Sequence, residues 1–246
     1  MRKITQRLPN ASVSAIAFLL IGSSNAVAQG QQYTPERAFI SVNAGMQPQR
    51  YTIHTADTFS IYDESGAVTS TLPIRNGAVF DIGGGYRIGA HFALAASFSS
   101  FGRSSSSTLT ASIPDPIFFG QAETVTSQSA ALDHSERGVH VQAVWFIPVT
   151  DKIDVALSAG PSFIHVTQQV PSVALPPGAT GVSMVSVAQA GFAKGANVGV
   201  DGSYMFSPRY GVGVFVRYAG GSINLPATSD IAVGGLQSGL GFRIRL

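Results

Sequence analysis

The chain has 246 residues, 15 Lys and Arg against 13 Asp and Glu, no Cys, and 11% charged residues, where an ordinary soluble domain has about 25%. The absence of Cys excludes a disulfide framework and thiolate metal sites, and 45% apolar residues are too many for a disordered chain. The longest nearly unbroken apolar run, 13–22, is too short for a membrane-spanning helix, which needs about 18 residues. Because the mean hydropathy is nevertheless +0.23, apolar residues must alternate with polar ones.

The first 28 residues have the pattern of a secretory signal peptide. Three basic residues within the first seven positions precede a continuous apolar run at 15–21, and a small-residue A-x-A site ends at Ala28. The alternative is an N-terminal anchor helix, but the apolar run is short and no stop-transfer pattern follows it. Removing these three bases from the 15 leaves 12 against 13 acidic residues, a mature net charge of −1. The mature chain therefore lacks the basic excess expected of a nucleic-acid-binding protein.

From position 37 onward the dominant pattern has a period of two, which places successive side chains on opposite faces of a strand. In each such run one face is apolar, and the other is rich in Gly, Ala and Ser. The pattern predicts eight strands, at 37–46, 78–88, 92–99, 139–147, 153–163, 197–206, 210–218 and 236–246.

Short and long connections alternate between these strands. The short ones are rich in turn-forming residues and lie at 89–91, 148–152 and 207–209. The long ones lie at 47–76, 102–138, 166–194 and 219–230. We expect three tight turns and both termini at one end, and four long loops at the other. Residues 51–62 still alternate and could prolong a hairpin.

The chemistry of the two faces distinguishes a sandwich from a membrane barrel. A sandwich would load its water-facing side with charged residues, whereas the less apolar face here consists mainly of small residues. The other face is nearly free of charge and has aromatic residues near the short-turn end, at Tyr86, Trp145, Tyr204, Phe206 and Tyr210. Tyr218 stands about 26 Å from Tyr210 along its strand, or about 20 Å along a tilted barrel, close to the ~25 Å between aromatic girdles. This face is predicted to contact lipid.

A β-sheet can cross hydrocarbon only as a closed barrel without free edges. The sequence therefore predicts an all-β fold, an eight-stranded antiparallel up-and-down transmembrane barrel with short periplasmic turns and four long extracellular loops. The small-residue face carries the strand charges, at Asp81, Arg87, Asp154, Asp201, Arg217, Arg243 and Arg245. We expect these side chains to pair as a structural network in the lumen, because isolated ions there would be poorly solvated.

Over about 37–246 the chain resembles the eight-stranded outer-membrane β-barrel family, that is, the OmpA/OmpX-like and opacity-protein-like small barrels. The C-terminus carries the most specific likeness, to the family's barrel-assembly signal, at Gly241, Phe242, Ile244 and Leu246. Leu246 stands where the family usually has Phe, and Leu240 where it usually has a polar residue. The resemblance implies a signal peptide at 1–28, a short periplasmic segment at 29–36 and a barrel domain at 37–246. It also implies an outer-membrane location, with lipid, lipopolysaccharide and the barrel-assembly machinery as partners.

The chain shows no motif of an enzyme or a cofactor site. The five His residues have no metal-ligand spacing and are expected to be surface or lumen polar groups. Some lipid-modifying barrels use an external His and Ser, and the nearest match here, 165–167, has Thr in place of Ser. Gly83 to Gly85 lie inside a predicted strand, so they do not form a phosphate loop. We predict no metal, no cofactor and no catalytic residue.

Two apolar stretches in the expected loops, 113–119 and 170–187, could cover the barrel mouth, contact a partner or prolong the strands. A Ser-rich patch at 104–107 is expected to be flexible. The leading hypothesis is a non-enzymatic barrel with an envelope-structural or surface-interaction role through its loops, with any surface or host ligand unknown. The alternative is a narrow porin-like or hydrophobic-ligand conduit, since eight strands leave room for side chains or one small ligand. A lipid-modifying enzyme is a further alternative.

Overall fold

A computed structural model describes residues 37–246 apart from 49–50, 75, 175–182 and 226–227; the predicted signal peptide and the segment 29–36 lie outside the described residues. The described part forms ten β-strands: β1 (Ala38–Gln47), β2 (Tyr51–Ile61), β3 (Glu64–Ile74), β4 (Gly77–Arg87), β5 (Phe92–Pro114), β6 (Ala122–Pro148), β7 (Ile153–Ala174), β8 (Ser183–Met205), β9 (Tyr210–Leu225) and β10 (Thr228–Arg245). Among these residues there is no helix with the length and apolar character of a membrane span.

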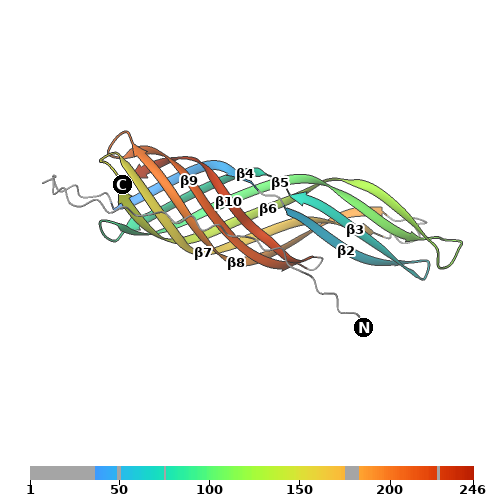
Figure 1. The fold of residues 1–246 in the computed structure, drawn as a ribbon. Helices are drawn as coiled ribbons and strands as arrows, with labels where there is room; N and C mark the ends of the chain where they lie inside the picture. Colours follow the sequence, from blue (N-terminus) through green and yellow to red (C-terminus); the bar gives the residue numbers. More distant parts are fainter. Residues whose placement is uncertain (1–36, 49–50, 75, 175–182, 226–227) are drawn as a thin grey trace, which may run out of the picture. The chain divides into compact units, whose positions relative to one another are not determined.

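Eight of the strands close into a ring (Figure 1). The hydrogen-bonded order is β4-β1-β10-β9-β8-β7-β6-β5, and β5 pairs back to β4, with every pair antiparallel. The first and last ring strands meet directly, from Phe39 opposite Arg245 to Met46 opposite Ser238. This confirms the predicted closed, eight-stranded antiparallel barrel. Its three short connections each have four residues, at 88–91, 149–152 and 206–209.

The other two strands form a hairpin inside the first long connection. β2 pairs with β3, and β3 pairs with β5 between Ala67–Thr71 and Thr108–Ser112. Tyr62 and Asp63, both with positive φ, make the tight turn between β2 and β3. We call β2, β3, residues 102–114 of β5 and residues 122–135 of β6 the projecting sheet. In Figure 1 this sheet lies at the end of the barrel away from the short turns.

The segments expected as long loops are therefore mostly strand. Residues 102–138 belong to β5 and β6 except for a turn at 115–121. The Ser-rich patch at 104–107, expected to be flexible, lies inside β5, and Ser107 is fully buried. Of the three alternatives for the apolar stretches, prolongation of the strands is what the structure shows at 113–114, 170–174 and 183–187; residues 175–182 lie outside the described part.

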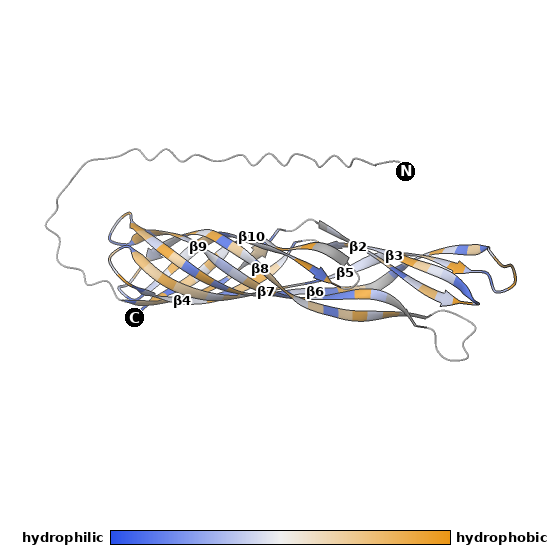
Figure 2. Ribbon diagram, turned by 90° about the horizontal axis from the view of Figure 1, so that it is seen from below, coloured by the Kyte–Doolittle hydropathy of each residue, from blue (hydrophilic) through white to orange (hydrophobic). Residues whose placement is uncertain are grey.

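The interior changes character along the barrel axis. Polar residues line its central part, and aliphatic clusters line the end away from the short turns. These clusters comprise Ile164, Val166, Ala193, Ile223, Leu225, Ile231 and Val233, and separately Leu72, Ile74 and Leu132. At the short-turn end, Phe39 and Phe146 pack against a small cluster of Ala93, Val144 and Ala156. Figure 2 shows hydrophobic and hydrophilic residues alternating along the strands, as two differently exposed faces require.

The glycines of β4 allow close packing inside the barrel. A Cβ on Gly85 would lie 2.5 Å from the Phe39 ring and 2.6 Å from the Leu94 carbonyl oxygen. Gly83 to Gly85 are therefore strand residues that admit an aromatic neighbour, and the structure contains no phosphate loop at this place.

Candidate functional site

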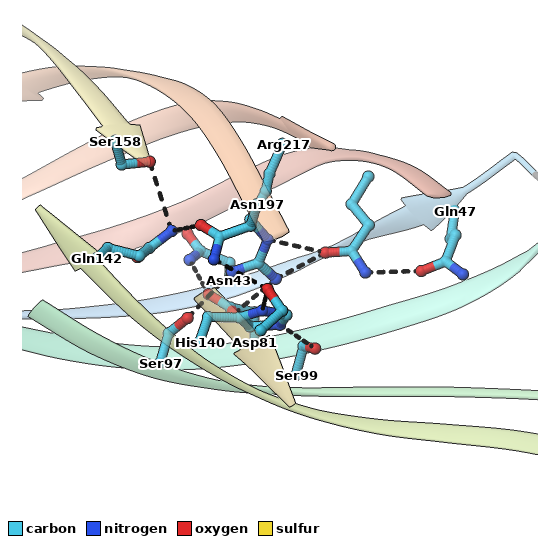
Figure 3. Close-up of polar contacts among 12 residues, drawn as sticks. Asn43, Gln47, Asp81, Ser97, Ser99, His140, Gln142, Ser158, Asn197 and Arg217 are labelled. Carbon is cyan, nitrogen blue, oxygen red and sulfur yellow. Dashed lines mark hydrogen bonds and ion pairs between the residues drawn. The ribbon is translucent and has the colours of Figure 1, made fainter. Parts of the chain in front are cut away.

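A buried ion pair lies in the lumen of the barrel (Figure 3). Arg217 on β9 and Asp81 on β4 are 6% and 3% exposed, and Arg217 Nη2 is 2.9 Å from Asp81 Oδ2. Arg217 also donates to Gln237 Oε1 from Nε and Nη2, at 3.0 and 2.6 Å, and to Ser97 Oγ from Nη1 at 3.0 Å. The guanidinium group thus links four strands, because Gln237 belongs to β10 and Ser97 to β5.

A second ion pair joins the first through an asparagine. Asn43 on β1 donates from Nδ2 to Asp81 Oδ1 at 2.8 Å and accepts from Arg243 Nη1 at 2.7 Å. Arg243 in turn pairs with Asp201 on β8 and donates from Nε to Asp201 Oδ1 at 3.1 Å. Both arginines therefore have an acid and an amide partner within the lumen.

The third part of this layer surrounds His140 on β6. Its Nε2 lies 2.9 Å from Ser99 Oγ, and its Nδ1 lies 2.8 Å from Ser162 Oγ. Asn197 donates to Ser162 Oγ at 2.9 Å and accepts from Gln142 Nε2 at 2.7 Å. With these contacts, side chains from all eight strands of the ring meet across the lumen.

Above this layer, away from the short turns, Glu136 is a buried acceptor with three donors. It is 4% exposed and lies 2.9 Å from His134 Nε2, while its Oε2 accepts from Gly234 N at 3.0 Å and from Gln47 Nε2 at 3.2 Å. Gln47 accepts from Gln237 Nε2 at 2.6 Å, which connects Glu136 to the Arg217 layer. The polar network is thus continuous from Glu136 to Asp201.

Below the central layer, an aromatic and ionic group closes the short-turn end. Arg245 donates to Asp154, and Arg87 Nη2 lies 3.9 Å from the same carboxylate. The Arg87 guanidinium lies 4.0 Å from the centroid of the Phe146 ring, which packs edge to face against Phe39 at 5.5 Å.

One cavity of about 120 Å³ lies in the lumen between these two layers. Its lining includes Arg217, Arg243 and Asp201 above and Arg87 and Phe146 below. Because one water molecule needs about 10–15 Å³ of such cavity volume, the cavity has room for several waters or one small solute.

All seven charges that the sequence analysis assigned to the lumen point inward in the structure. Each of the four arginines lies within ion-pair distance of an aspartate. Sequence reasoning missed Glu136 and Gln47, which it assigned to expected loops, and it did not single out His134, Gln237 and Asn197 as members of the network. Glu136 could have been found, because it continues the inward parity of Gly138 and His140, but it lay in an expected loop. With Glu136 included, the lumen charges balance at four Arg and four acids among the described residues.

The outer surface of the ring is an apolar belt. Most of the side chains that alternate with the lumen residues are apolar, and most of the large ones among them are 40–70% exposed. The predicted girdle residues all lie on this surface with 46–55% exposure: Tyr86, Trp145, Tyr204, Phe206, Tyr210 and Tyr218. On β9 the belt runs from Tyr210 through Val212, Val214 and Val216 to Tyr218.

The belt ends abruptly on the side away from the short turns. On β5 the outward side chains are apolar up to Phe98, and on β6 the last apolar one is Val139. The outward rows of the projecting sheet then consist mainly of Thr, Ser, Ala and Gln, with Thr69, Thr110 and Thr126 side by side on β3, β5 and β6. Such a hydroxyl-bearing surface suits water, whereas the belt suits hydrocarbon.

A closed ring without free edges, an apolar belt and a charge-balanced polar interior define a transmembrane β-barrel of the outer-membrane type. Barrels of this type generally have short periplasmic turns and longer extracellular connections, and the projecting sheet lies at the end away from the short turns.

The chain is similar to several solved structures at low sequence identity. The chain is similar to the crystal structure of Neisserial surface protein A, with 13% identity, a TM-score of 0.45 and coverage of 85% of this chain and 97% of that one. It is also similar to OprG of Pseudomonas aeruginosa, with 9% identity, a TM-score of 0.45 and coverage of 85% and 96%. The outer membrane protease OmpT of Escherichia coli matches with 8% identity, a TM-score of 0.41 and coverage of 89% and 99%.

No family model matches the chain, and no curated protein matches its sequence. The identities of the three structures are too low to transfer a role to this chain.

The residues of the predicted barrel-assembly signal lie on both faces of the end of the chain. Phe242 and Leu246 are outward and exposed, and Ile244 pairs with Ile40 of β1. Gly241 faces inward, where a Cβ would meet the Asn43 side chain. The role of these residues in barrel assembly remains a prediction.

The described residues contain no cluster of three or more His, Cys, Asp or Glu that could hold a metal ion. His54 and His134, expected in loops, lie in strands, and His134 is 1% exposed. Ser99 and His140 form a Ser–His pair, but neither of them lines the lumen cavity. On the outer surface, the centroids of the His165 and Phe192 rings are 4.6 Å apart.

Proposed function

We propose that this chain is a non-enzymatic outer-membrane barrel whose projecting sheet mediates interactions at the cell surface. The observation that supports this most is the continuation of β5 and β6 beyond the apolar belt. From Arg137 to Ala122, β6 adds 15 residue steps, or about 50 Å of strand at 3.3 Å per residue. Strands of this length are not needed to cross the bilayer.

The structure of the sheet fits a platform for contacts in water. Its inner side is packed, because Val68, Leu72 and Leu109 are 2–3% exposed. Its outer side consists mainly of hydroxyl-bearing residues. A packed sheet of this kind holds a binding surface in a fixed position more precisely than flexible loops do.

The alternative function, a conduit, is disfavoured by the polar network of the lumen. Side chains from all eight ring strands meet there, and the cavity below them is about 120 Å³. In our proposal, the belt contacts outer-membrane lipid and lipopolysaccharide, and the assembly machinery recognises the last strand. Enzymatic activity on lipid is the remaining alternative; lipid A from cells with and without the protein should have the same mass spectrum.

The chain has no Cys, so single-Cys reporters test the proposal directly. Thr126→Cys places a thiol on the projecting sheet, and Asp151→Cys places one in a short turn. On intact cells, a membrane-impermeant maleimide should label the first variant only, and it should label the second after the outer membrane is permeabilised. Labelling of the Asp151→Cys variant alone on intact cells would refute the orientation. Reproducible unitary conductance of the purified protein in a planar bilayer would favour the conduit.

A further inference from the structure

The tip of the β5–β6 hairpin carries exposed apolar side chains far from the belt. Phe119 and Ile117 are 84% and 80% exposed, the highest values among the large apolar residues that the structure describes, and Phe118 is 59% exposed. The three residues are consecutive. Tyr62, in the neighbouring β2–β3 turn, is 41% exposed. An apolar patch of this kind in water marks a site of interaction.

The tip is held in a defined conformation. Asp115 Oδ1 accepts from the backbone N–H groups of Ile117 and Phe118, at 2.7 and 3.0 Å. Asp115 N donates to the Gln121 carbonyl oxygen at 2.8 Å, which closes the turn. Gly120 N donates to Glu64 Oε1 at 2.5 Å and so joins this turn to the β2–β3 turn. The apolar residues are therefore presented by a braced structure.

The charges around the tip all have one sign. Asp63 and Glu64 lie in and beside the β2–β3 turn, Asp115 begins the β5–β6 turn, and Glu123 follows it. The segments 51–74 and 104–136, which make up nearly the whole projecting sheet, contain no Lys and no Arg. The apolar tip thus has an acidic border with no neighbouring base.

We propose that the tip is a docking site for a basic polypeptide that has an apolar face or pocket. This inference rests on the proposed function, because it assigns a partner to the projecting sheet. The apolar residues protrude, so they fit an apolar depression on the partner, and the acidic border is complementary to Lys or Arg around it. A lipid surface is the less fitting occupant. A neutral bilayer would leave the acidic border without a partner, and an anionic bilayer would repel it.

The test uses the full mature chain in nanodiscs of zwitterionic lipid and three labelled peptides of equal length. An amphipathic Leu/Lys peptide carries both features, a Leu/Glu peptide reverses the charge, and a Ser/Lys peptide removes the apolar face. Fluorescence anisotropy should show binding of the Leu/Lys peptide only. Binding should weaken as salt is raised, because the ionic part of the contact is screened.

Two sets of substitutions separate the two features. Replacement of Ile117, Phe118 and Phe119 by Ser should weaken binding at least tenfold, since burial of even one such side chain accounts for about that factor. The second set removes the acidic border by four substitutions together: Asp63→Asn, Glu64→Gln, Asp115→Asn and Glu123→Gln. The amides introduced at positions 115 and 64 would keep the hydrogen-bond acceptors of the turn. Asn at position 63 tolerates the positive φ found there. This neutral variant should bind more weakly and lose most of the salt dependence.

Val187→Ser on β8 and Asp133→Asn on β6 are the matched controls, as an exposed apolar position and an acidic position away from the tip, and both should bind as the unchanged chain does. Absence of Leu/Lys binding, equal binding of the Ser/Lys peptide, or binding unaffected by the tip substitutions would overturn the proposal. So would tip-dependent binding of phosphatidylcholine vesicles in place of the peptide. If the Thr126→Cys reporter is still labelled from outside, the failure concerns this partner and leaves the proposed function standing.

Discussion

Removal of the Arg217 side chain should destabilise the barrel strongly. In the Arg217→Leu variant, Gln237 and Ser97 lose their guanidinium donor, and Asp81, 3% exposed, keeps only the Asn43 amide. Loss of one partner of a buried ion pair typically costs about 3–5 kcal/mol, because the other charge stays buried. We expect the free energy of unfolding to fall by this amount.

A double-mutant cycle isolates the charge contribution. Asp81→Asn removes the acid but keeps an acceptor for the Asn43 amide. The double variant Asp81→Asn/Arg217→Leu has no unpaired buried charge from this ion pair. Its loss in free energy of unfolding should therefore be smaller than the sum of the two single losses, by about 0.5–3 kcal/mol.

Urea unfolding in detergent, followed by the fluorescence of the single Trp, measures these differences. Trp145 lies in the belt, 51% exposed, so its emission should shift when the barrel opens. Asp151→Asn in an exposed turn is the control and should stay within about 0.5 kcal/mol of the unchanged chain. A loss below about 1 kcal/mol for Arg217→Leu, or a double variant that loses the full sum, would refute the role assigned to this pair.

Three further predictions concern the ends of the network and the tip. Glu136→Gln should cost about 1–3 kcal/mol in the same urea assay, because at least one buried donor loses its acceptor. Gly234→Ala should also cost at least about 1–3 kcal/mol, since φ is +80° there and a Cβ would meet a neighbouring carbonyl oxygen; an unchanged midpoint would contradict this. Backbone N–H groups of Ile117 and Phe118 lower the pKa of Asp115 below its ordinary 3.8, so the turn is stabilised above that pH and loosens only as pH falls through the lower folded pKa. Amide chemical shifts in a pH titration measure this, and a midpoint at or above 3.8 would contradict it.

The ring could be predicted from the sequence because its chemistry is simple. Each strand alternates between a lipid-facing apolar side chain and an inward one that is mostly small or polar. On β9 the outward residues run from Tyr210 to Tyr218, and the inward ones are Gly211, Gly213, Phe215 and Arg217. Four-residue turns such as 206–209 are rich in turn formers and separate the strands clearly. Inward charges such as Arg243 could be assigned by parity alone. Their partners could not, because the Asn43 bridge between Arg243 and Asp81 depends on the stagger of strands far apart in sequence.

The projecting sheet was anticipated only in part: the alternation at 51–62, where β2 lies, indicated a hairpin, but the rest was expected as loop for a different physical reason. In the expected loop 102–138, outward residues such as Thr110 are hydroxyl-bearing and inward ones such as Leu109 are apolar. The apolar residues of this segment lie at the parity opposite to that of the belt, because outward apolar residues are favoured only where the surroundings are hydrocarbon. The Ser-rich composition of residues 104–107 is typical of flexible segments, but these residues belong to β5 and pair with β6.

On β7 the apolar side chains change from the outward to the inward face where the strand leaves the belt, while the backbone continues as a regular strand. Leu157 and Phe163 are outward and apolar, whereas beyond them Ile164 and Val166 are inward and apolar, at 3% and 0% exposure. The pairing of β7 with β8 continues through this point without a register shift, so the strand does not slip and no bulge rotates the side chains. The apolar residues change face because the surroundings change. In the belt region lipid lies outside and polar groups lie inside, whereas in the extension water lies outside and an aliphatic core lies inside. A shift of apolar parity by one residue along an unbroken alternation is thus the sequence signal that a barrel strand has left the membrane, and it separates such an extension from a true loop.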